Sequence, residues 1–166
     1  EILSILENRV KTEDYSAAKD APRVLVTGSP LGGDTFKVYK LIEEEGGVVV
    51  SMDSCTGRKS FVPTFDQNEK DVYAALAKRY LEIPCACMSP NEGRFTELSN
   101  QIEKYKTHAV VDVVLQACHT YNIETGKIRD HVTGKQSIAY TTVETDYSQA
   151  DIGQLKTRLG AFIEML

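Results

Sequence analysis

Apolar positions in this chain gather in four short runs, separated by longer stretches in which apolar residues recur every three or four positions. The runs lie at residues 23–27, 48–52, 109–116 and 137–143. The third run, Ala-Val-Val-Asp-Val-Val-Leu-Gln, is rich in valine, which is typical of a strand that helices cover on both faces. The pattern therefore predicts four largely buried strands of a parallel sheet.

The stretches between the runs have helical spacing. We expect helices over residues 1–11, 36–45, 66–81, 92–106, 122–132 and 151–166. Apolar residues three or four apart share one face of a helix and mark the side that packs. These faces are formed by Ile2, Ile5, Leu6 and Val10; by Phe36, Tyr39 and Ile42; by Val72, Leu76 and Tyr80; by Phe95, Leu98 and Ile102; by Ile123 and Ile128; and by Ile152, Leu155, Leu159, Phe162, Ile163 and Leu166.

Strands that alternate with helices predict the α/β class, here a three-layer open parallel sheet of about four strands, flavodoxin-like or Rossmann-like, with right-handed crossovers. The expected strand order is 2-1-3-4. This domain would occupy residues 23–166. Residues 1–22, a helix followed by a polar linker, would be the tail of a preceding domain or a strap across this one. The chain begins at Glu1 rather than Met, which indicates either a piece of a longer protein or a processed one.

Composition narrows the function classes. The chain has 166 residues, of which 42% are hydrophobic and 26% charged, and its formal net charge is -5. No cluster of lysine and arginine stands out, so we expect no nucleic-acid partner. No apolar run is long enough to cross a bilayer and no signal peptide is apparent, so we expect no membrane association and a cytoplasmic location.

Two cysteines follow predicted strands. Cys55 comes directly after the second run and Cys118 directly after the third. The carboxyl ends of parallel strands share one edge of the sheet, and open α/β proteins bind ligands beyond that edge. Both thiols should therefore emerge there, and the proline-bounded loop that carries Cys85 and Cys87 is expected to fold onto the same edge.

The loop after the first strand nearly matches a phosphate-binding loop. Gly28, Gly33 and Thr35 occupy their positions in that motif, but Asp34 stands where the lysine should be. A carboxylate there would repel phosphate, so we disfavour a nucleotide site. We expect Asp34 to be a helix N-cap and the glycines to permit a tight turn.

The cysteines form no Cys-x-x-Cys pair, which argues against a zinc knuckle or a thioredoxin motif. They are either buried thiols that serve as small hydrophobic residues or ligands of a soft metal site, because thiolates select iron–sulfur clusters, zinc or copper. Single cysteines on separate loops favour a cluster held in a cleft. Arg58 and Lys59 should favour the thiolate of Cys55.

Five stretches resemble the C-terminal domain of subunits of the 2-hydroxyacyl-CoA dehydratase and benzoyl-CoA reductase family. They are Arg-Val-Leu-Val-Thr-Gly-Ser-Pro from residue 23, Asp-Ser-Cys-Thr-Gly-Arg from residue 53, Pro-Cys-Ala-Cys-Met-Ser-Pro-Asn from residue 84, Leu-Gln-Ala-Cys-His-Thr-Tyr-Asn from residue 115, and the segment from Glu-Thr-Asp-Tyr-Ser at residue 144 to Gln-Leu-Lys-Thr-Arg. The resemblance implies an oxygen-sensitive iron–sulfur cluster and an ATP-hydrolysing activator protein that supplies single low-potential electrons. It also implies an identical or related partner subunit and an acyl-CoA substrate, which is dehydrated or reduced.

The resemblance also suggests roles for particular residues. Cys118 matches a cluster ligand of the family, and Cys85, Cys55 and Cys87 are further candidate ligands. His119 would donate a proton or hydrogen-bond a sulfide; the alternative is an imidazole that caps the following helix. Glu144, with Asp146 beside it, would serve in acid–base catalysis; the alternative is that both cap the last helix.

Three alternatives stay open from the sequence. The cluster is a single [4Fe–4S] cubane or a double cubane, and the Cys-Ala-Cys loop fits the double-cubane branch of the family better. In the double-cubane branch the protein would be a reductase. A third possibility, of another class, is a flavodoxin-like module for subunit contact whose thiols are inert. We expect the isolated fragment to lack the cluster and to be inactive alone.

Overall fold

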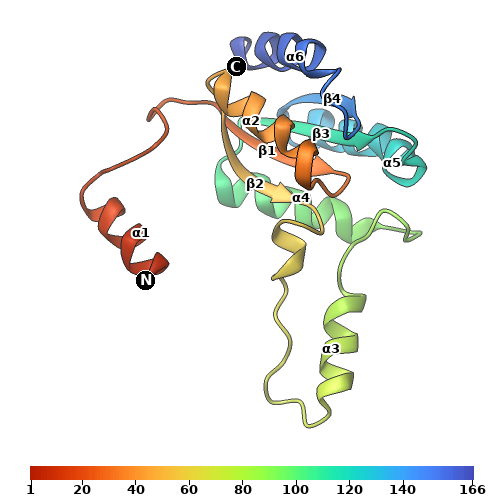
Figure 1. The fold of residues 1–166 in the computed structure, drawn as a ribbon. Coiled ribbons are helices and arrows are strands. Elements are labelled where there is room, and N and C mark those ends of the chain that lie inside the picture. The colour runs from red at the N-terminus through yellow and green to blue at the C-terminus, as the bar shows by residue number, and fades with distance from the viewer.

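A computed structural model describes all of residues 1–166. Its centre is a single four-stranded sheet with the order β2-β1-β3-β4, and every neighbouring pair of strands is parallel (Figure 1). The strands are β1 Arg23–Gly28, β2 Val48–Asp53, β3 Ala109–Leu115 and β4 Ala139–Thr145. The predicted α/β class and the predicted strand order are both confirmed.

Six α-helices accompany the sheet: α1 Ile2–Lys11, α2 Lys37–Glu44, α3 Val72–Leu81, α4 Glu92–Tyr105, α5 His119–Asp130 and α6 Ile152–Glu164. Two 3-10 turns, Gly33–Phe36 and Arg58–Ser60, and a π-helical turn, His131–Lys135, complete the elements. Helices α2 and α6 lie on one face of the sheet, and α4 and α5 lie on the other (Figure 1). No helix combines the length and the apolar character needed to cross a bilayer.

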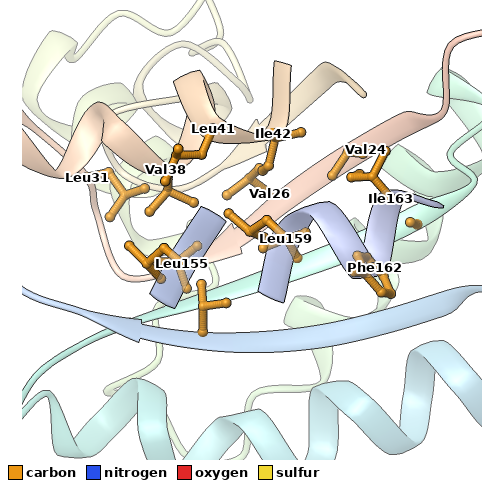
Figure 2. Close-up of a cluster of buried hydrophobic side chains, with 14 residues drawn as sticks. Val24, Val26, Leu31, Val38, Leu41, Ile42, Leu155, Leu159, Phe162 and Ile163 are labelled. Carbon is orange, nitrogen blue, oxygen red and sulfur yellow. The ribbon is translucent and has the colours of Figure 1, made fainter. Parts of the chain in front are cut away.

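The larger core lies between the sheet and the helices α2 and α6. It contains 14 buried side chains, all of them apolar, and Figure 2 shows those of α6 interleaved with those of α2 and β1. Leu155 and Leu159 are completely buried there. Full burial of one such side chain stabilises the fold by about 1.5–3 kcal/mol, so this layer is a major source of stability.

The other face of the sheet is apolar at the amino end of its strands and polar at the carboxyl end. Leu25 of β1 belongs to a smaller cluster of six buried residues formed with α4 and α5. Successive side chains on one face of a strand are two residues apart. Two residues beyond Leu25 lies Thr27, and two residues beyond Val110 lies Asp112; both are buried. This polar region lies directly below the candidate site.

Gly28 permits the close approach of β1 to β3. Its φ is +104°, and a Cβ atom at this position would lie 2.1 Å from the carbonyl oxygen of Val113. In the following loop the Thr35 hydroxyl accepts the Gly32 N–H at 2.8 Å, while Asp34 makes no cap. The prediction that Asp34 is an N-cap is therefore wrong: the N-cap residue is Gly32, and the hydroxyl of Thr35, the third residue of the turn, reaches back to its N–H.

The third helix differs most from its predicted form. It begins at Val72 rather than residue 66, because the Asp71 carboxylate caps it by accepting the N–H groups of Tyr73 and Ala74 at 2.9 and 3.2 Å. Figure 1 shows α3 projecting away from the sheet. Its apolar face, which includes Leu76 and Tyr80, is exposed, and its buried residues are Ala75 and Arg79. Helical spacing marked the face but could not tell whether anything covers it.

Other apolar positions also differ from the predicted packing. Phe36 and Ile123 are exposed, although both were expected on packed faces. Ile128 is buried as expected, but Ile123 lies five residues before it, about 140° away around the helix, and therefore cannot share its buried face. Helix α5 itself begins at His119, three residues earlier than predicted. Helix α1 has no buried residue and lies apart from the sheet, so a strap across the domain is not observed (Figure 1).

Candidate functional site at the carboxyl edge of the sheet

Cys55 and Cys118 emerge at the same edge of the sheet, as predicted. Cys55 lies two residues beyond the end of β2, and Cys118 three residues beyond the end of β3, where it is the N-cap residue of α5. Because β2, β1 and β3 are parallel, their carboxyl ends are adjacent. Both thiols are free, with Cys55 exposed and Cys118 half-buried.

Cys85 and Cys87 form a close pair of thiols. Cys87 donates to Cys85, with the sulfur atoms 3.4 Å apart. The backbone N–H of Cys87 and its thiol hydrogen bond hold the pKa of Cys85 below its ordinary value, and the same contact raises the pKa of Cys87. A thiolate at Cys55 would raise the pKa of Cys87 further, as the last and smallest of the causes that act on that thiol. Cys85 is therefore the stronger candidate for a thiolate in this pair.

Cys118 has separate surroundings. Burial would raise its pKa, but the backbone N–H of Tyr121 and the hydroxyls of Ser29 and Thr120 outweigh burial and lower the pKa below its ordinary value. Its sulfur lies 3.8 Å from the Thr120 hydroxyl oxygen. None of the other cysteines contributes to this shift. The structure thus pairs Cys85 with Cys87 and leaves Cys118 against the loop after β1.

No three histidine, cysteine, aspartate or glutamate side chains converge closely enough to hold a single metal ion. His119 is exposed at the first position of α5, and its imidazole makes no hydrogen bond to the protein. The expected alternative for His119, a helix cap, is therefore not observed.

Glu144 lies within β4 rather than after it, and its side chain is exposed. It borders a polar hollow of about 320 Å³ together with Asp146 and Arg158. The last helix begins at Ile152 with Asp151 as its N-cap residue, and the Asp146 carboxylate instead accepts the Ser148 N–H at 2.7 Å. Capping of that helix by Glu144 and Asp146 is therefore wrong, because the chain turns once more before the helix begins.

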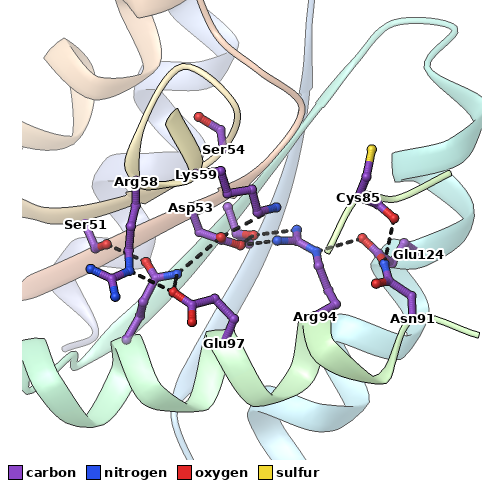
Figure 3. Close-up of polar contacts among 12 residues, drawn as sticks. Ser51, Asp53, Ser54, Arg58, Lys59, Cys85, Asn91, Arg94, Glu97 and Glu124 are labelled. Atoms are coloured by element: carbon purple, nitrogen blue, oxygen red, sulfur yellow. Dashed lines mark hydrogen bonds and ion pairs between the residues drawn. The ribbon is translucent and has the colours of Figure 1, made fainter. Parts of the chain in front are cut away.

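A buried ion network underlies the cysteine-bearing edge. Arg94 of α4 has only 1% of its side chain exposed. Its guanidinium pairs with the Asp53 carboxylate, donates from Nε to Glu124 Oε2 at 2.9 Å, and donates from Nη2 to the Thr27 hydroxyl at 2.8 Å (Figure 3). All three nitrogens of the guanidinium therefore have partners.

Asp53, the last residue of β2, is the anion at the centre of this network. Burial would raise the pKa of this carboxyl, but the charges of Arg94 and Lys59, with hydrogen bonds from Thr27 and Gln101, outweigh burial and lower the pKa below 3.8. Thr27 donates to Asp53 at 2.8 Å and Gln101 donates at 3.2 Å. Asp53 is therefore ionised, with both of its oxygens engaged.

The same network joins three cysteine-bearing segments. Asp53 precedes Cys55 by two residues. Asn91 donates to the Cys85 carbonyl oxygen at 2.9 Å and to Glu124 Oε1 at 2.8 Å. Glu124 belongs to α5, whose N-cap residue is Cys118. Through Arg94, the positions of these three segments are fixed relative to one another.

Lys59 is the cation of this region that lacks a hydrogen-bonded partner. Its side chain is 3% exposed, and its Nζ lies 3.6 Å from Asp53 Oδ1 without a hydrogen bond. Burial lowers its pKa, and the Asp53 charge opposes that effect. Arg58 and Lys59 were both expected to favour the thiolate of Cys55, but Arg58 pairs with Glu97 instead, at 2.7 Å.

The roles of Arg94, Asn91, Gln101 and Glu124 were not predicted from the sequence. A signal was present: Arg94 and Gln101 precede and follow Leu98 by four and three residues, and so share its inward face of α4. A charged residue on the apolar face of a helix predicts a buried partner of opposite charge. The identity of that partner depends on contacts between residues up to 67 positions apart.

Comparison with known proteins establishes the family. A family model described as 2-hydroxyglutaryl-CoA dehydratase, D-component, matches residues 1–166. The chain belongs to this family. A relative from Escherichia coli (strain K12), named "Putative dehydratase subunit YjiM", is 48% identical over 158 residues, which cover 95% of this chain and 41% of that protein. This member of the dehydratase family thus spans about two fifths of that relative's length.

Proposed function

We propose that this chain is the cluster-bearing part of a dehydratase-type subunit, with Cys118, Cys85, Cys55 and Cys87 as ligands of an iron–sulfur cluster. The observation that carries the proposal is that the free thiols of Cys55 and Cys118 follow separate strands at the carboxyl edge of one parallel sheet, and that Asn91 ties the loop of Cys85 and Cys87 to Glu124 of α5. Thiolates are the usual ligands of such clusters. The lowered pKa values of Cys85 and Cys118 favour the ligating form.

The chemistry of the residues fits a cluster better than a single ion. No three donors converge on one point, whereas a cluster is wider than one ion and takes ligands that stand further apart. A buried amine without an acceptor, that of Lys59, lies among the residues below these thiols. A bound anionic sulfur group would supply both the negative charge and the acceptor that this amine lacks.

In this proposal the cluster, when bound, supplies single low-potential electrons to an acyl-CoA, which loses water or is reduced. The cysteines hold the cluster, and the Arg94 network keeps their segments in place. His119 and Glu144 are exposed at the same edge and would move protons during elimination of water. The partners are an identical or related subunit and an ATP-hydrolysing activator, in the cytoplasm.

The test is iron and sulfide analysis of the full-length protein purified without oxygen. Cys118→Ser, Cys85→Ser and Cys55→Ser should each lower the iron content and abolish dehydration of the acyl-CoA. His119→Gln should keep the iron and lower the rate only. Full iron content in all three cysteine variants, with folding intact by circular dichroism, would contradict the ligand assignment.

Two observations favour related alternatives. The 3.4 Å contact between Cys85 and Cys87 favours a double cubane, which needs more thiolates; such a protein would be a reductase and contain twice the iron of a single cubane. The exposed apolar face of α3 favours a module for subunit contact. That module would assemble normally without iron, and the same iron analysis, combined with the oligomeric state, separates the three possibilities.

A further inference from the structure

Lys59 has three N–H donors and no acceptor, although its side chain is almost completely buried. Its nearest anion, Asp53, is already engaged by Arg94, Thr27 and Gln101. A buried ammonium without a hydrogen bond is costly. The missing acceptor is therefore expected from a group that binds to this edge.

The surroundings of Lys59 indicate where that group binds. The ionisable groups that act on its ammonium are Asp53, Arg94, Cys55 and Glu124. Arg94 and Glu124 are paired with each other at 2.9 Å, and Cys55 is exposed. The Lys59 charge also acts on the Cys85 thiol. Figure 3 shows Lys59 extending past Asp53 toward the side on which Cys85 and Arg94 lie. The thiols that interact electrostatically with Lys59 are thus Cys55 and Cys85.

We propose that Lys59 is a positioning residue whose ammonium donates hydrogen bonds to an anionic sulfur group assembled on Cys55 and Cys85. This inference rests on the proposed iron–sulfur function and adds a residue to it. Reduction adds negative charge to such a group, and a cation with free donors stabilises the reduced form more than the oxidised form. Lys59 therefore raises the reduction potential of the group.

Arg94 cannot serve in this way, because its guanidinium nitrogens are all engaged within the chain. The backbone of Lys59 is held independently of its side chain. Its N–H donates to the Ser54 carbonyl oxygen at 3.2 Å, and its carbonyl oxygen accepts Arg79 Nη2 at 2.9 Å. A substitution of the ammonium alone should therefore leave the loop in place.

The experiment uses the full-length protein, purified without oxygen, with wild-type, Lys59→Met, Lys59→Arg and the control Arg58→Met. Iron and sulfide are measured first, and the potential is then found by a redox titration followed by electron paramagnetic resonance. We expect Lys59→Met to lower the equilibrium constant for one-electron reduction about tenfold, which corresponds to about 59 mV. Lys59→Arg should recover most of the loss, and Arg58→Met should match wild-type.

Each outcome of this experiment either supports or overturns the role of Lys59. A wild-type protein without iron and sulfide overturns the proposed function and this inference with it. An iron-loaded Lys59→Met protein with the wild-type potential overturns this inference alone. Loss of iron in Lys59→Met that Lys59→Arg restores supports a role for the charge, whereas loss of iron in both variants assigns Lys59 a purely structural role and overturns the inference.

Discussion

The two faces of the sheet bury different kinds of side chain. The face covered by α2 and α6 rests on 14 buried apolar side chains. The face covered by α4 and α5 has a cluster of only six, and beside it lie the buried polar groups Asp53, Arg94 and Glu124. Side chains alternate between the faces along each strand, so one strand contributes to both.

The apolar face mainly stabilises the fold, whereas the polar face mainly positions the residues of the candidate site. An apolar layer stabilises the fold through the area that it buries, and because this effect has no direction it does little to fix the positions of the loops. A buried ion network contributes little net stability, because desolvation offsets the attraction, but its directional contacts fix its members in place. Here those members belong to the segments that carry Cys55, Cys85 and Cys118.

The largest effect is expected from removal of the central cation. Arg94→Met would leave Asp53 and Glu124 buried without their main partner, which should lower the free energy of unfolding by about 3–5 kcal/mol. Urea denaturation of the purified proteins measures this change in the free energy of unfolding. Arg129, which pairs with Asp130 on the surface, is the matched control, and Arg129→Met should change the stability little. Equal effects of the two substitutions would contradict the view that the network is structural.

The apolar face should respond through cavity formation. Leu159 is completely buried, and Leu159→Ala should cost about 2–5 kcal/mol. Leu81, at the end of α3, is exposed, so the same substitution there should change the stability by no more than about 0.5 kcal/mol. Because both variants replace leucine by alanine, any difference between their free energies of unfolding should reflect the burial of Leu159 alone. A large loss at Leu81 would mean that α3 is covered in solution.

The two faces should also differ in their response to acid. The folded pKa of Asp53 is lowered below 3.8, so its contribution is fully present above that pH and is lost as the pH falls through the lowered pKa. The stability difference between wild-type and Asp53→Asn should therefore shrink below about pH 4. The difference between wild-type and Leu159→Ala involves no titrating group and should stay constant. A pH-independent Asp53→Asn difference would exclude an ionised Asp53.

The smallest effect lies outside both faces. Asp71 caps α3, and Asp71→Ala should cost about 1 kcal/mol, because two N–H groups lose their acceptor. Asp71→Asn should retain most of the stability, since its amide oxygen can still accept. If the alanine variant is as destabilised as Arg94→Met, then α3 is more than an appendage of the domain.

The local sequence pattern was sufficient to predict the secondary structure and the architecture of this protein. Valine-rich runs and helical spacing determined the strands and most of the helices, because each depends on residues within a few positions of one another. The strand order followed from the alternation of strands and helices, which is typical of a flavodoxin-like sheet. The shared edge of Cys55 and Cys118 followed from the same frame, since parallel strands end together. The buried stripe of α4 at Leu98 and Ile102 was also predictable.

Tertiary structure decided everything that depends on distant partners. Asp53, Arg94 and Glu124 are ordinary charged residues in the sequence, and they form a network only because the sheet brings β2, α4 and α5 together. The apolar face of α3 has helical spacing like that of α6, yet one is exposed and the other buried, because periodicity identifies a face without identifying what covers it. Likewise, Lys59 lacks an acceptor only because the folded chain has already used those of Asp53.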